Sequence, residues 1–193
     1  MPETLKRLLI ISPLPNFSVS GAAAGTPDRV VGFDLGVVRV ASAVTVTIAA
    51  LVPDGLFHIA ICDEELTPVD MDCDFDIIAI TANVAQAQRA IWMGKEFMKR
   101  GKTVIMGGPH VSLAPDLFNG AAHSLCIGEL EPIAHDVFGD LHRGQIKERY
   151  IGSKADLAKS PLPRWDLYPH DHAVSGVVQT SRGCPFECNF CDV

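Results

Sequence analysis

Apolar residues in this chain gather in short continuous runs, and longer amphipathic stretches separate the runs. Such runs are typical of strands that are buried on both faces, as in a parallel sheet covered by helices. The predicted strands cover residues 8–12, 57–62, 75–81, 103–106 and 123–127. The pattern therefore predicts an α/β protein with a five-stranded parallel sheet.

The stretches between the runs predict the helices that would cover this sheet. They cover residues 35–52, 84–100, 113–118 and 132–143. Gly101 directly follows the second of these, at the position where helices commonly end in the left-handed conformation. Because crossovers between parallel strands are right-handed, we expect a doubly wound, flavodoxin-like sheet that binds ligands beyond the carboxyl ends of its strands.

Three of those carboxyl ends carry residues suited to binding. Ser12 precedes a long stretch rich in glycine, proline, serine and alanine, residues 13–34. Thr81 ends the third strand, and Gly107 and Gly108 follow the fourth. Two glycines let a bulky ligand approach the backbone, but they also suit a tight turn from strand to helix. Both interpretations remain open from the residues alone.

The pattern changes after residue 150. Residues 159–168 contain two prolines and a tryptophan, which indicates an extended linker. Residues 177–180 (VVQT) read as a lone strand that has no partner. We therefore expect a domain over residues 1–150, a linker over 151–175, and over 176–193 the first strand and cluster loop of a truncated second domain.

Composition narrows the function classes. The 193 residues are 48% hydrophobic and 20% charged, as in a globular protein with a core. A net charge of −7 disfavours binding to a nucleic-acid backbone. The apolar run at residues 8–13 is too short for a signal peptide, and residues 40–52 fall short of the roughly 20 needed to span a membrane. A cytoplasmic protein that does not span the membrane is expected.

Three of the six cysteines crowd together near the end of the chain. Cys184, Cys188 and Cys191 follow the spacing C-x-x-x-C-x-x-C. Iron–sulfur clusters usually take four cysteines, so three on one loop suggest a 4Fe-4S cluster with one iron open to a small molecule. The alternative is a structural zinc site, whose fourth ligand would come from His170, His172 or elsewhere.

The other three cysteines are scattered along the chain. Cys62, Cys73 and Cys126 could hold a second cluster, but free cysteines are commonly buried core residues, and we favour that interpretation. Glu129 and Glu131 form an acidic turn before the last predicted helix, where carboxylates can cap a helix N-terminus.

The segment TSRGCPFECNFCDV, residues 180–193, resembles the signature of the radical SAM superfamily, in which an aromatic residue precedes the third cysteine. Phe190 is that aromatic residue here, and it would shield the cluster and contact a ligand. The resemblance implies that the open iron binds S-adenosylmethionine. A reducing donor protein would supply an electron to the cluster. Transfer of that electron to S-adenosylmethionine would cleave its sulfonium bond and release a 5′-deoxyadenosyl radical.

The segments MGGPHVSLAPD, CIGELE and SPLPRWDLY precede the cysteines in that order. This arrangement resembles the cobalamin-binding domain of cobalamin-dependent radical SAM proteins, and among them the hopanoid C-2 methylase subgroup. By that resemblance Gly107 and Gly108 would line the groove for the cobalamin nucleotide tail, with Ser12 and Thr81 near the same edge.

Two family motifs differ in this chain. The family's Ser-x-Leu stands here as Thr81-Ala82-Asn83, and the cobalt-ligating D-x-H-x-x-G is absent from the sequence. The resemblance therefore assigns no lower axial ligand to cobalt.

The resemblance implies methyl transfer to an unactivated carbon of a small-molecule or lipid-like substrate. Two alternatives stay open: a radical cyclase or rearrangement enzyme of the magnesium-protoporphyrin ester cyclase type, and a cobalamin-binding module without catalysis. No catalytic residue can be named in these 193 residues, and we expect them to be inactive alone.

Overall fold

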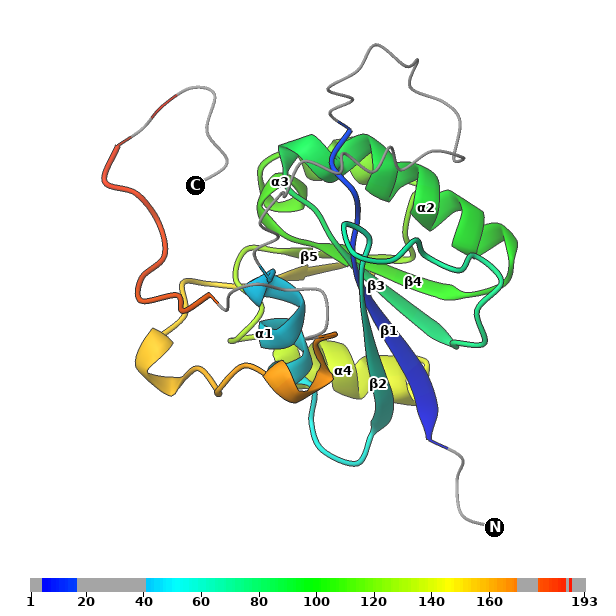
Figure 1. Ribbon diagram of the computed structural model, residues 1–193, viewed down its shortest axis with the longest axis horizontal. Coiled ribbons are helices and arrows are strands. Elements are labelled where there is room, and N and C mark those ends of the chain that lie inside the picture. Colours follow the sequence, from blue (N-terminus) through cyan, green and yellow to red (C-terminus); the bar gives the residue numbers. More distant parts are fainter. Residues whose placement is uncertain (1–4, 17–40, 170–176, 187, 189–193) are drawn as a thin grey trace.

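The computed structural model describes residues 5–16, 41–169, 177–186 and 188. Its centre is a parallel sheet in the order β2-β1-β3-β4-β5-β6 (Figure 1). The strands are β1 (Lys6–Ser12), β2 (Phe57–Asp63), β3 (Ile77–Thr81), β4 (Thr103–Gly107), β5 (Ser124–Ile127) and β6 (Arg149–Ile151). The predicted doubly wound α/β fold is confirmed, and all five predicted strands are present.

Helices cover both faces of the sheet, because successive side chains of each strand point to opposite faces. In β1, Leu9 and Ile11 pack in the core that includes α2 (Ala87–Lys99), while Leu8 and Ile10 pack in the core that includes α1 and α4. Figure 1 shows α2 and α3 on one side of the sheet and α1 and α4 on the other. The other helix bounds are α1 Ala43–Leu51, α3 Pro109–Leu113 and α4 Ala134–Arg143.

The expectation of five strands is corrected by a sixth, β6. Its register pairs Cys126 of β5 with Tyr150, and Tyr150 is buried while Arg149 and Ile151 are exposed. A three-residue strand with a single buried side chain gives almost no apolar pattern along the chain. Only its hydrogen bonding to β5 identifies it.

The helices differ from the prediction at their starts. The described part of the first predicted helix becomes helical only at Ala43, and residues 35–40 lie outside the described residues. The stretch after β3 opens with a 3-10 helix, Val84–Gln86, before α2 begins. After β4, Pro109 starts α3 at once, and a separate 3-10 helix, Pro115–Phe118, follows because the residue before a proline disfavours the helical conformation.

The segment predicted as an extended linker lies against the domain instead. Tyr168 is 3% exposed and packs with Ala41 and Val46. Its hydroxyl donates to the Asp63 carboxylate at 2.8 Å and accepts the Ser42 N–H at 3.3 Å. The strand predicted at residues 177–180 is wrong, since these residues adopt no regular structure and pair with no described strand.

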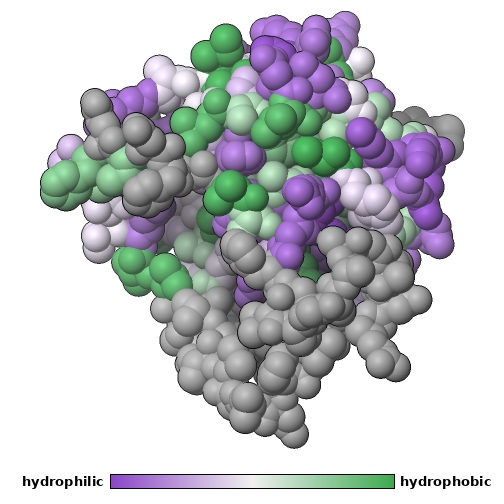
Figure 2. Space-filling model, turned by 90° about the horizontal axis from the view of Figure 1, so that it is seen from above, coloured by the Kyte–Doolittle hydropathy of each residue, from purple (hydrophilic) through white to green (hydrophobic). Residues whose placement is uncertain are grey.

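The surface above the carboxyl edge of the sheet mixes apolar and polar patches (Figure 2). Val84, Leu113 and Leu117, which follow β3 and β4 in the chain, are each more than half exposed. Among the helices of the described residues, none is long and apolar enough to cross a membrane.

Candidate functional site

The sheet brings three of the predicted binding positions together at its carboxyl edge. Ile11 pairs with Ile80, and Thr81 pairs with Gly107, so the ends of β1, β3 and β4 lie side by side. The strand order reverses between β1 and β3, which is where doubly wound sheets bind ligands. Ser12 and Thr81 therefore flank the switch point, and Gly107 lies one strand further on.

The chain leaving β1 is fixed by Gln86. Its side-chain amide donates to the Ser12 hydroxyl at 3.2 Å and to the Pro13 carbonyl at 2.7 Å. Asn83 and Gln86 form a reciprocal capping box, in which each side chain accepts the other residue's backbone N–H. The Ser12 hydroxyl, predicted to bind a ligand, thus already has a protein partner.

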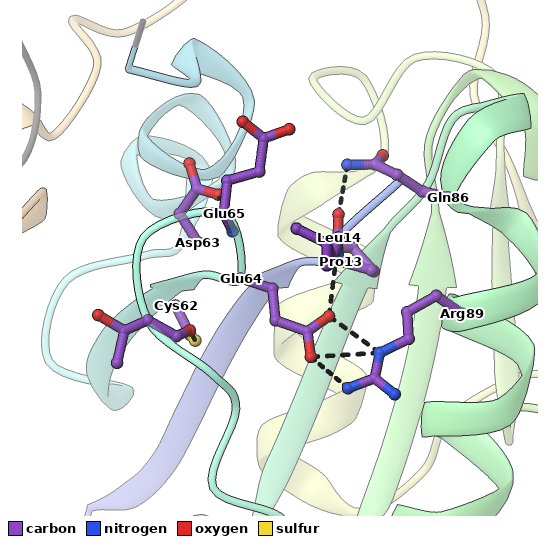
Figure 3. Close-up of polar contacts among 9 residues, drawn as sticks. Pro13, Leu14, Cys62, Asp63, Glu64, Glu65, Gln86 and Arg89 are labelled. Atoms are coloured by element: carbon purple, nitrogen blue, oxygen red, sulfur yellow. Dashed lines mark hydrogen bonds and ion pairs between the residues drawn. The ribbon is translucent and has the colours of Figure 1, made fainter. Parts of the chain in front are cut away.

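A buried carboxylate next to this turn joins three elements (Figure 3). Glu64 follows β2, and its carboxylate accepts the Leu14 N–H at 2.9 Å and the Arg89 Nε at 3.1 Å. The guanidinium Nη2 of Arg89, on α2, completes a bidentate ion pair. The Glu64 side chain is 4% exposed, and the guanidinium also lies over the Trp92 ring at 4.5 Å.

Sequence reasoning missed Glu64, Gln86 and Arg89. The available signal was the acidic run Asp63-Glu64-Glu65 directly after a predicted strand, which places carboxylates at the edge where ligands bind. Nothing in the sequence paired that run with an arginine on a helix 25 positions later.

Gly107 and Gly108 form a tight connection between β4 and α3. Gly108 has φ +108°, and a Cβ there would lie 2.7 Å from the Ala82 carbonyl oxygen and 2.9 Å from the Thr81 hydroxyl. The backbones are tied by Ala82 N–H to Gly107 O at 3.0 Å and His110 N–H to Ala82 O at 3.2 Å. This packing alone requires glycine at position 108, and a ligand role for either glycine stays a prediction.

The acidic turn after β5 is hydrogen-bonded to this connection through Ser112. The Ser112 hydroxyl donates to the Gly108 carbonyl at 3.0 Å and accepts the Gly128 N–H at 2.9 Å. Glu129 and Glu131 then point toward the later chain: Glu129 accepts the Ala155 N–H at 2.6 Å, and Arg182 lies 2.6 Å from Glu131. Their interpretation as caps of the next helix is wrong, because both carboxylates bind the chain beyond residue 150.

Two of the three clustered cysteines lie within the described residues. Cys184 and Cys188 are both exposed, and Gly183 turns the chain before them with φ +85°. Cys191, Phe190, His170 and His172 lie outside the described residues. Thiols that are open to solvent on one irregular loop suit a metal or cluster, because thiolates are the ligands that iron–sulfur clusters use.

The scattered cysteines cannot form a second cluster with one another. Cys62 and Cys73 pack against the core that includes α2, whereas Cys126 belongs to the core on the opposite face. Burial raises the pKa of the Cys126 thiol to about 12, and burial followed by Glu64 and Asp63 raises that of Cys62 to about 12. Cys126 is a buried core residue, as predicted, whereas Cys62 and Cys73 are only partly buried and pack against the edge of the core. Within the described part of the chain, no three histidine, cysteine or acidic side chains are placed to hold a metal ion.

Curated relatives of the chain are methyltransferases, and the names of three of them specify a carbon position. Bacteriochlorophyllide d C-8(2)-methyltransferase of Chlorobaculum tepidum is 34% identical over 151 residues, which is 69% of this chain and 32% of the relative. Bacteriochlorophyllide d C-12(1)-methyltransferase of the same organism is 27% identical, covering 70% of the chain and 31% of the relative. Hopanoid C-2 methylase of Rhodopseudomonas palustris is also 27% identical, covering 76% and 29%.

The chain thus spans about a third of the length of these relatives. The predicted resemblance to the hopanoid methylase subgroup and to methyltransferases is confirmed at this level. No protein-family model matches the chain. Among solved structures, the N-terminal domain of a hypothetical protein of Thermotoga maritima aligns with 44% of this chain and 73% of its own, at 23% identity and a TM-score of 0.36.

Proposed function

We propose that this chain forms the cofactor-binding part of a cobalamin-dependent radical SAM methyltransferase that acts on an unactivated carbon. The observation that carries the proposal is the C-x-x-x-C-x-x-C spacing in a chain whose relatives are carbon methyltransferases. Its cysteines would hold a 4Fe-4S cluster: the thiols of Cys184 and Cys188 are exposed and therefore accessible to iron, and Cys191 would be the third ligand.

The carboxyl edge of the sheet is the proposed cobalamin surface. Gly107 and Gly108 lie partly exposed at this edge, and residues without side chains let a bulky ligand approach the backbone. Thr81 is 5% exposed and Ser12 6% exposed. Their side chains would therefore pack beneath the bound cofactor and form part of the floor of the site. When bound, the two cofactors supply the radical chemistry and the methyl group.

The chain's own residues would hold these cofactors and exclude water from between them. The cluster also needs one electron per turnover, which a reducing donor protein would supply. The substrate class we propose is a large, mostly apolar small molecule, because the relatives' names specify a bacteriochlorophyllide and a hopanoid. Replacing Cys184 by alanine in the source cells should abolish one methylated lipid or pigment, detectable by mass spectrometry, and an unchanged profile would contradict the proposed activity.

Anaerobic reconstitution with iron and sulfide tests the cluster. We expect about four irons and four sulfides per chain with a broad visible absorption band. Cys184→Ala should lose most of this iron, whereas the matched control Cys73→Ala should keep it, since Cys73 is a partly buried residue in the segment between β2 and β3. Equal iron content in the two variants would refute the assignment.

Addition of hydroxocobalamin, followed by gel filtration, tests the second cofactor separately. A corrinoid band that stays with the folded chain at about one per molecule supports the carboxyl-edge site. A folded chain that retains no corrinoid would remove cobalamin from the proposal and leave the cluster assignment intact.

A further inference from the structure

One arginine ties the chain in front of the cysteine loop to the carboxyl edge of the sheet. Arg182 lies two residues before Cys184, and its Nη1 is 2.6 Å from Glu131 Oε1 and 3.8 Å from Glu129 Oε2. The side chains of Arg182 and Glu131 are 24% and 12% exposed. Partial burial strengthens such a pair, because water screens it less.

The acidic turn that receives Arg182 is held firmly by its surroundings. A Cβ on Gly152 would lie 1.9 Å from the Glu129 carbonyl oxygen, so the two backbones are in close contact next to β5 and β6. The Ser160 hydroxyl donates to Glu131 at 3.1 Å. Besides Arg182, Glu129 binds the Ala155 N–H and Glu131 binds the Ser160 hydroxyl, so each carboxylate is already held by one bond when it meets the guanidinium.

The turn is also connected to the proposed cobalamin edge. Gly128, at its start, donates to Ser112, which in turn donates to Gly108. A continuous set of hydrogen bonds therefore links the glycine connection after β4 to the acidic turn, and the ion pair extends it to the residue before the cysteine loop.

We infer that Glu131, assisted by Glu129, is a positioning residue that holds the cysteine loop at the carboxyl edge of the sheet through Arg182. The consequence for catalysis rests on the proposed function, since the contact would keep cluster and cobalamin at the same edge. The contact between Arg182 and Glu131 involves only side chains of this protein. It can therefore be tested without iron, cobalamin or turnover.

Chymotrypsin cleavage after Phe186 reports on this contact in the full chain. Phe186 is 72% exposed, so the protease reaches it once the flanking segment is free to extend. Glu131→Arg and Arg182→Glu should each raise the cleavage rate about three- to tenfold, because a partly buried ion pair is replaced by like charges. The matched control is Glu148→Arg, an exposed charge reversal just before β6, which should leave the rate within about twofold of the unaltered chain.

The charge-swapped chain that carries both Glu131→Arg and Arg182→Glu separates positioning from general damage. It should restore cleavage to within about twofold of the unaltered chain, which a merely disruptive effect of either change would not do. Thermal melting by circular dichroism confirms that each variant is folded. Unchanged cleavage in the single variants, or no restoration in the swapped chain, would overturn the inference.

Because no metal is present in this assay, its failure leaves the iron measurement on Cys184→Ala unaffected. Conversely, absence of a cluster would not alter the expected cleavage rates.

Discussion

At the residue scale, the carboxyl edge is shaped by positions that tolerate no side chain. Gly108 combines a left-handed φ with backbone atoms of Ala82 inside the space of a Cβ. The same glycine connects β4 to the helix whose Ser112 holds the acidic turn. Folding alone therefore requires glycine at this position. A ligand that contacted Gly108 would bind a backbone conformation that the fold already has.

Replacing Gly108 by alanine should lower the free energy of unfolding by about 2 to 4 kcal/mol, since strain and a clash with Ala82 add together. The matched control is Gly120→Ala, where φ is +73° but nothing lies within 4 Å of the new Cβ, so only about 1 to 2 kcal/mol should be lost. Urea denaturation measures both variants. Equal losses would show that the contact with Ala82 contributes nothing.

At the element scale, polar contacts between neighbouring elements fix the turns that end the strands. The Glu64–Arg89 pair joins the end of β2, the chain after β1 and helix α2. A buried pair need not add net stability, but removal of one partner leaves the other charge without compensation.

Arg89→Ala should therefore lower the free energy of unfolding by about 3 kcal/mol, because the Glu64 carboxylate stays buried without its cation. Arg100→Ala, just after the same helix, is the control. Its partner Asp72 is 87% exposed, and its other partner, Glu96, keeps its ion pair with Lys99, so the loss should stay below about 1 kcal/mol. Chemical denaturation compares the two. A loss at Arg89 no larger than at Arg100 would contradict the structural role of Glu64.

The short strand β6 makes stability depend on alkaline pH through Tyr150. Burial and the hydrogen bond to Asp140 raise the pKa of Tyr150 to about 12, against about 10 in an unfolded chain. The folded state therefore binds this proton more tightly, so its stabilisation is complete below about pH 10 and is lost as the pH rises toward about 12.

Urea denaturation midpoints at about pH 9 and about pH 11 should show a smaller fall for Tyr150→Phe than for the unaltered chain. Some fall should remain, because burial and Asp63 also raise the pKa of Tyr168. An identical fall in both chains would mean that Tyr150 does not carry the effect.

At the scale of the whole molecule, the segment after β6 returns to the sheet and closes the end near α1. Tyr168 reaches Asp63 at the end of β2, 105 positions earlier in the sequence. Arg164 N–H also bonds the Val46 carbonyl of α1 at 3.0 Å. This return brings residues 153–169 past the acidic turn before the chain reaches the cysteines.

Tyr168→Phe should speed amide hydrogen exchange in residues 153–169 and cost about 1 to 3 kcal/mol, since Asp63 and the Ser42 N–H each lose a buried partner. Tyr150→Phe removes a comparable hydroxyl elsewhere in the sheet and should leave exchange in residues 153–169 unchanged. If both variants exchange alike there, the Tyr168 hydroxyl does not hold the segment.

The amino-acid sequence by itself determined five of the six strands of the sheet and the spacing of the clustered cysteines. Continuous runs such as that at residues 8–12 specify strands buried on both faces, because no other placement removes every side chain of the run from water. Gly101, at the end of α2, has the left-handed φ expected of it. The spacing of Cys184, Cys188 and Cys191 is visible in the sequence itself, because the three residues lie close together along the chain.

The tertiary structure alone decided what depends on partners distant in the sequence. β6 exists because β5 pairs with it, and the residues after 151 fold back because Tyr168 binds Asp63. The segment 177–180, predicted as a strand, pairs with no strand of the described residues. Glu64 and Glu131 become binding partners only when folding brings Arg89 and Arg182 to them. Apolar periodicity is a local property of the chain, whereas the pairing of charges and edge strands depends on which surfaces the core leaves next to one another.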